Sequence, residues 1–62
     1  MQKTALEQVT ALAFFLYHLE KDQPNATYGS HHVGDAFEAV AFIMQVPADA
    51  LRKACGRLDA IH

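Results

Sequence analysis

Two long apolar stretches most constrain what this chain of 62 residues can fold into. Residues 11–17 and 36–44 are almost entirely hydrophobic, and hydrophobic residues make up 52% of the whole sequence. A domain of about 60 residues buries only about 60% of the surface that its unfolded chain exposes. The chain therefore has more apolar surface than one small core can cover. We expect the excess to be covered by a partner, and the simplest partner is a second copy.

The spacing of the apolar residues predicts an all-α fold. We expect one small three-helix domain over residues 1–62, with a dimer as its assembled form. The predicted helices lie at about residues 4–21, 35–45 and 47–61, and a loop rich in turn-forming residues lies at about 23–33.

Local signals indicate where these helices begin. Thr4 and Glu7 have the spacing of a capping box, in which each residue binds the backbone of the other. Asp35 and Glu38 repeat that spacing at the second helix, although Ser30 could cap an earlier start. Pro47 suits the first position of the third helix, because that position needs no N–H donor.

The first two helices are apolar over more of their surface than one neighbour requires. The first has an apolar arc of about 200°, and the second has only a narrow polar strip. Phe14 projects outside the main arc, so we expect it to be exposed in an isolated monomer. We predict that the dimer or partner interface consists of Phe14, Phe15, Tyr17, Ala39, Phe42 and Ile43.

The chain has few other means of stabilising so small a domain. Its one cysteine, Cys55, cannot form an intrachain disulfide, and its place at the edge of an apolar stripe suggests a small core residue. The histidines (His18, His31, His32 and His62) lack the spacing of a closed metal site. We therefore predict no metal and no cofactor, and association remains as the stabilising device.

Residues 37–56 carry a pattern that resembles helix-turn-helix DNA-binding proteins. Ala41 is the small residue expected where the two helices cross, and Val46 is the apolar residue expected in the turn. Apolar residues at matching spacings follow on the inner faces, namely Val40, Met44, Leu51 and Ala54. The resemblance implies that the helix at 47–61 is a recognition helix. It also implies that Arg52 and Lys53 face the major groove and that Arg57 lies near a phosphate.

The chain departs from that family in two places. The turn position usually held by glycine is Gln45, and glutamine does not favour left-handed backbone. The outer face of the second helix, which in the family meets the DNA backbone with polar groups, offers Ala39 and Phe42.

The net charge and the absence of known motifs exclude several classes of protein. A formal net charge of -2 is untypical of a protein that coats nucleic acid or an anionic membrane. No apolar run reaches the roughly 18 residues of a membrane span, and no signal-peptide cleavage site follows the first residues. With a single cysteine, these features predict a cytoplasmic protein without a membrane partner. We find no catalytic set, phosphate loop or nucleophile elbow, so we do not expect an enzyme.

Two hypotheses remain. The first is a small non-enzymatic regulator that homodimerises through apolar helix faces and binds another, unidentified protein. The alternative is a dimeric helix-turn-helix regulator that binds double-stranded DNA with its third helix.

Overall fold

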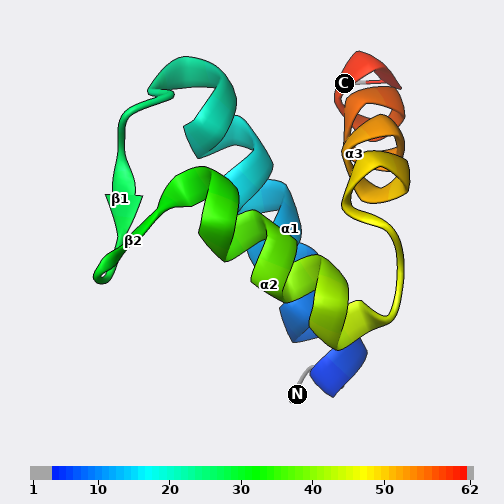
Figure 1. Cartoon of the computed structure of the whole chain (residues 1–62). Coiled ribbons are helices and arrows are strands. Elements are labelled where there is room, and N and C mark those ends of the chain that lie inside the picture. Colours follow the sequence, from blue (N-terminus) through cyan, green and yellow to red (C-terminus); the bar gives the residue numbers. More distant parts are fainter. Residues whose placement is uncertain (1–3, 62) are drawn as a thin grey trace.

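The computed structural model describes residues 4–61 and contains three helices, as predicted. They are α1 (Ala5–Asp22), α2 (Val33–Met44) and α3 (Ala48–Ile61). In Figure 1, α1 and α2 lie side by side and run in opposite directions, while α3 stands at a steep angle to α2. His62, one of the histidines considered above, lies outside the described residues.

The capping box predicted at the start of α1 is confirmed. The Glu7 N–H donates to the Thr4 hydroxyl oxygen at 3.2 Å, and the Thr4 N–H donates to the Glu7 carboxylate at 3.3 Å. At the other end, the Gln23 N–H donates to the Leu19 carbonyl at 2.8 Å. Pro24 follows, and it disfavours helical backbone at the residue before it. Because both boundaries depend on neighbours in the sequence, the sequence predicts α1 to within a residue.

The second capping box is not present. The helix α2 begins at Val33, two residues before the predicted start, so Asp35 lies inside its first turn. Its N-cap is His32, whose side chain makes no capping hydrogen bond. Val33 is completely buried, and its N–H donates to the Ala26 carbonyl at 3.0 Å. Burial of Val33 and this link to the preceding loop, rather than a local cap, place the start of α2.

The predicted loop contains a short antiparallel sheet that was not predicted from the sequence. Its strands are β1 (Thr27–Tyr28) and β2 (His31–His32), with Thr27 paired to His32 and Tyr28 to His31. The two residues between the strands begin with Gly29, whose φ is +64°. A glycine with positive φ at the first loop position is typical of the tight turns that join two strands of a hairpin through a two-residue loop. Figure 1 shows this hairpin projecting beside α2.

The turn between α2 and α3 corrects the expectation for Gln45. This residue is left-handed, with φ 61° and ψ 40°, although it is not glycine. The Val46 N–H donates to the Ala41 carbonyl at 3.1 Å, and the Gln45 N–H donates to the Phe42 carbonyl at 3.0 Å. These two bonds form a Schellman motif, which satisfies the last carbonyls of α2. The helix α3 then begins at Ala48, one residue later than predicted.

The core lies where the three helices meet. Its largest fully buried side chains are Leu16 from α1 and Val33 and Phe37 from α2. Cys55 is 4% exposed and belongs to the same cluster, which confirms its interpretation as a core residue. The remaining buried members are Ala13, Val40, Ala41 and Leu51. This core covers only one side of each helix and leaves several large apolar residues on the surface.

Candidate interaction surfaces

The first candidate surface is the outer side of α2, which we call the α2 face and define as Ala39, Phe42 and Ile43. All three were predicted as interface residues, and all three are exposed. Phe42 is 72% exposed and Ile43 is 67% exposed. Residues three and four positions apart lie on the same side of a helix, so Ala39 adjoins both. The α2 face therefore presents two large apolar side chains to solvent around one small residue.

The predicted interface residues of α1 differ in their exposure. Phe15 is exposed, and its ring packs against Tyr28 of the hairpin with the ring centroids 6.2 Å apart. Phe14 is half-buried rather than exposed as expected, and its ring contacts that of His18 edge to face at 4.6 Å. Tyr17 is half-buried against α3. A Cβ added at Gly56 would lie 3.3 Å from its hydroxyl oxygen.

A groove that the sequence did not predict lies between α1 and α3. This α1–α3 groove has a volume of about 620 Å³. Its exposed margins carry Leu6 from α1 and Leu58 from α3, whereas Ala13 and Cys55 are almost fully buried at its base. The other lining residues are Glu7, Thr10, Ala11, Phe14, Met44, Leu51 and Ala54. No pattern along the sequence could reveal the groove, because it arises from the angle at which α3 meets α1.

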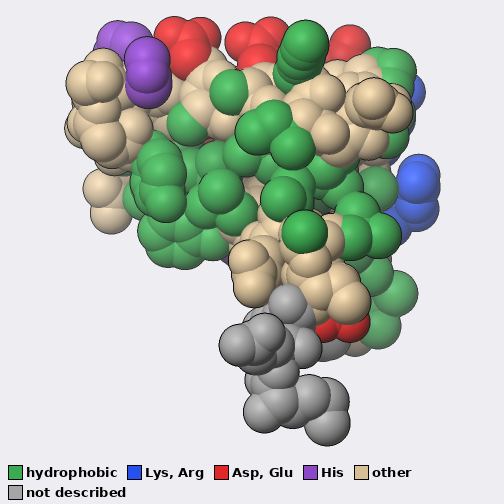
Figure 2. All heavy atoms as spheres, turned by 90° about the horizontal axis from the view of Figure 1, so that it is seen from below, with side chains coloured by type: hydrophobic (Ala, Val, Ile, Leu, Met, Phe, Trp, Pro, Cys, Tyr) green, Lys and Arg blue, Asp and Glu red, His purple; other side chains and the backbone are tan. Residues whose placement is uncertain are grey.

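A smaller hollow connects the groove to α2. It has a volume of about 260 Å³ and is lined by Ala5, Leu6, Val9, Ile43 and Met44. Leu6 and Met44 also line the groove, and Ile43 belongs to the α2 face. Figure 2 shows a broad area of hydrophobic side chains, with acidic side chains along one edge and basic ones at one side.

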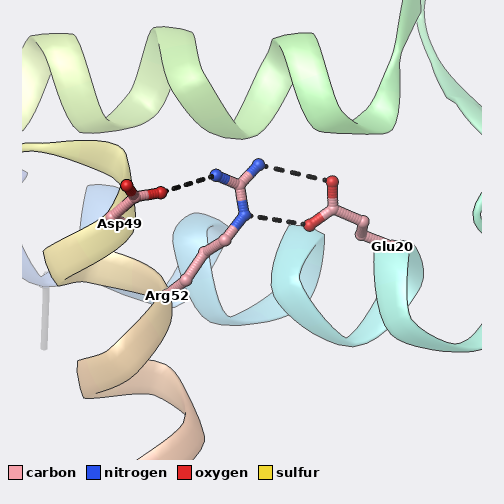
Figure 3. Close-up of polar contacts among 3 residues, drawn as sticks. All are labelled: Glu20, Asp49 and Arg52. Atoms are coloured by element: carbon pink, nitrogen blue, oxygen red, sulfur yellow. Dashed lines mark hydrogen bonds and ion pairs between the residues drawn. The ribbon is translucent and has the colours of Figure 1, made fainter.

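A network of charged residues joins the three helices. The Arg52 guanidinium in α3 donates to the Glu20 carboxylate in α1 at 3.2 and 3.4 Å, and it lies 3.9 Å from Asp49 (Figure 3). The same guanidinium lies over the Phe37 ring of α2, 4.8 Å from its centroid. A Cβ added at Gly34 would lie only 2.8 Å from Glu20 Oε2, so glycine gives the carboxylate room beside α2.

This network changes the interpretation of the basic residues assigned to DNA. Arg52 is half-buried and directed towards α1, so its side chain is engaged within the fold. Lys53 and Arg57 are exposed on α3. Asp49, in the first turn of the same helix, has a side chain that is 95% exposed. The surface of α3 thus offers two basic side chains with an acidic one near its start.

A second polar cluster joins the ends of α1 and α3. The Lys21 ammonium lies 3.1 Å from the Asp59 carboxylate, and His18 lies 3.4 Å from its other oxygen. The hydrogen bond to Asp59, and then its negative charge, raise the pKa of Lys21 above the ordinary value of a lysine. These contacts hold α3 against the C-terminal half of α1, so the groove opens along the N-terminal half.

Two further observations concern ligands and membranes. Within residues 4–61, no three histidine, cysteine, aspartate or glutamate side chains group closely enough to hold a metal ion. Among the helices described, none combines the length and apolar character needed to cross a membrane.

The chain matches no protein-family model, no curated protein and no solved structure.

Proposed function

We propose that this protein is a small non-enzymatic interaction domain that self-associates through the α2 face and binds another protein. The observation that supports this proposal most is the exposure of Phe42 and Ile43, at 72% and 67%. Monomeric proteins expose single apolar residues routinely, whereas larger contiguous apolar patches mark interaction sites.

The expected strength of association follows from the number of side chains. Burying a Phe or Ile side chain contributes about 1.5–3 kcal/mol. In a two-fold symmetric contact, Phe42 and Ile43 from both subunits contribute about 6–12 kcal/mol before the cost of association. That cost is itself about 4–15 kcal/mol. Only the most favourable ends of these ranges, about 12 against about 4 kcal/mol, leave a net of about 8 kcal/mol, so we expect association that depends on concentration, with a dissociation constant that is micromolar at its tightest.

The test is a charge placed on the α2 face. Phe42→Glu introduces a carboxylate where an apolar contact is expected, so it should abolish association through this face without unfolding the exposed site. Ala50→Glu adds the same charge at an exposed position of α3 and serves as the matched control. Sedimentation velocity measures the mass, and circular dichroism measures the helix content. A Phe42→Glu protein that associates as strongly as the control would refute the α2 face as an interface.

A helix-turn-helix regulator is the second candidate, and the turn favours it. Left-handed Gln45 gives a turn of three residues between α2 and α3, which matches the helix-turn-helix connection. Two exposed basic residues, Lys53 and Arg57, remain available on α3. Against this candidate are the engagement of Arg52 with Glu20, the exposed Asp49 carboxylate and the apolar α2 face.

Fluorescence anisotropy with labelled duplex DNA at low salt separates the two candidates. DNA binding should weaken steeply as salt rises, because counterions are released from phosphates. It should also be lost in Lys53→Ala plus Arg57→Ala and retained in Phe42→Ala. An unchanged affinity in the Lys53 and Arg57 variant would show that α3 does not carry the contact.

A further inference from the structure

We infer that the α1–α3 groove is a binding site for a small, uncharged molecule with an aromatic or hydrocarbon body. The groove is lined by residues other than those of the α2 face, so its occupation requires no self-association and goes beyond the proposed function. The volume of the groove, the small side chains at its base and the apolar chemistry of its lining point to this class of ligand.

The volume of the groove suits a small molecule. Binding sites for small molecules have volumes of about 300–1,000 Å³, and this groove has a volume of about 620 Å³. An apolar cavity of about 150 Å³ takes benzene, so the groove has room for about three or four rings or an equivalent hydrocarbon chain. A helix of another protein is about 10 Å across, so the same volume would hold only about one and a half turns of it. The groove is therefore large enough for a small molecule and too small to enclose a helix.

Small side chains at the base give the groove its depth. Ala13 of α1 and Cys55 of α3 lie there with 1% and 4% exposure, and both belong to the packed core. Leu6 and Leu58 are exposed and stand at the margins. Because core packing fixes the base, the site is formed before a ligand arrives, and little ordering of the protein opposes binding. A ligand that enters removes this apolar surface from water, which is favourable.

Met44 gives the groove an adaptable wall. It comes from the C-terminal end of α2, is half-buried, and lines both the groove and the smaller hollow beside it. Methionine has three rotatable bonds and a sulfur that packs favourably against aromatic rings. Its side chain can therefore adjust to apolar ligands of different outline.

The lining offers little to a charged ligand. Glu7 is the one charged residue among those described there, and its carboxylate accepts a hydrogen bond from the Thr4 N–H in the cap of α1. Within residues 4–61, no basic side chain lines the groove, so an anion finds no opposite charge. A charge that loses water without a partner is costly. The Thr10 hydroxyl adds one polar group, so the ligand has an apolar body and at most a small polar substituent.

Titration of the protein into phenylnaphthylamine, an uncharged fluorophore, tests the proposal. Its fluorescence should rise and saturate at one probe per chain, in the wild type and equally in Phe42→Glu. Ala54→Phe places a ring in the groove and should weaken binding by about tenfold or more. Ala60→Phe adds the same ring at an exposed position of α3 outside the lining, and should change the affinity by less than about twofold.

The methyl groups of alanine locate a ligand without any substitution, so this measurement decides even if circular dichroism shows Ala54→Phe to be unfolded. The ligand here is indole, which is uncharged and more soluble. Its ring should shift the NMR signals of the methyl groups of Ala13 and Ala54, which line the groove. The signals of Ala39 on the α2 face and Ala60 on α3 should stay in place.

Other results would overturn the proposal. Absence of saturable binding would show that the groove is not a ligand site. An unchanged affinity in folded Ala54→Phe would place the probe elsewhere, and so would shifts at Ala39 with binding lost in Phe42→Glu. Tighter binding of anilinonaphthalene sulfonate, the same rings with a negative charge, would contradict an uncharged ligand. None of these results changes the mass of the wild type or of Phe42→Glu, so the proposed self-association stands or fails separately.

Discussion

The Glu20 carboxylate lies against Gly34 of α2 and Arg52 of α3, so the side chain at Gly34 affects an ion pair between two other helices. We predict that Gly34→Ala and Glu20→Ala have non-additive effects on stability. An alanine at Gly34 gains up to about 1 kcal/mol of helix propensity. In the wild type, its Cβ must shift the Glu20 carboxylate that pairs with Arg52, which offsets part of this gain.

A double-mutant cycle in urea measures that coupling. With Glu20→Ala already present, Gly34→Ala should stabilise the protein by about 0.5–1 kcal/mol. In the wild type, Gly34→Ala should stabilise the protein by at least about 0.5 kcal/mol less than it does in the Glu20→Ala variant. If the effects of the two substitutions on the free energy of unfolding add to within about 0.3 kcal/mol, the ion pair of Glu20 does not depend on the space at Gly34.

The buried thiol of Cys55 predicts a loss of stability at alkaline pH. Burial raises the pKa of Cys55 above that of an exposed thiol, so the folded state keeps its proton after the unfolded state has lost it. The unfolded state then binds fewer protons, and stability falls as pH rises through the unfolded thiol's pKa. The raised pKa of Lys21 acts in the same direction, because its folded state also holds the extra proton.

Urea unfolding between about pH 7 and 10 tests this prediction. The free energy of unfolding should fall at the alkaline end, and Cys55→Ala should reduce that fall. A fall of the same size in both proteins would assign it to other groups, Lys21 among them.

At the scale of the elements, the turn between α2 and α3 contains a conformation that glutamine does not favour. Left-handed backbone costs a non-glycine residue about 1–2 kcal/mol, part of which is offset by the greater freedom of an unfolded glycine. Gln45→Gly should therefore stabilise the protein by about 0.5–1 kcal/mol. The control Ala50→Gly, in an exposed part of α3, should destabilise it by about 1 kcal/mol. Thermal unfolding measures both, and a destabilised Gln45→Gly protein would contradict the left-handed assignment.

Helices whose boundaries depend on neighbouring residues in the sequence could be predicted. Boundaries that depend on contacts between distant parts of the chain could not. The three helices follow from apolar spacing, and the start of α1 follows from Thr4 and Glu7. The start of α2 was misplaced because Asp35 and Glu38 also have capping spacing, while burial of Val33 decides the boundary. The hairpin was missed because Gly29 signals a turn but two-residue strands give no alternating pattern.

At the scale of the whole molecule, the exposure of Phe42 on α2 could be predicted from the sequence. The side of α1 that α3 covers could not. The narrow polar strip of α2 implied that Phe42 would remain outside the core, and it is exposed. Phe14 was placed wrongly, because the position of α3 covers part of α1. From its position in the sequence, Arg52 was expected to be a basic residue on the outward-facing side of α3. Only the crossing of α3 over α1 brings Glu20 close enough to pair with it.

We expect the apolar surface left outside this core to be covered by a second copy. Sedimentation equilibrium of the wild-type protein, at concentrations from about micromolar to about a thousand times higher, tests this most directly. We expect an average mass that rises from one chain to two or more as concentration increases. A mass of one chain throughout that range would contradict self-association and leave a different protein as the only occupant of these surfaces.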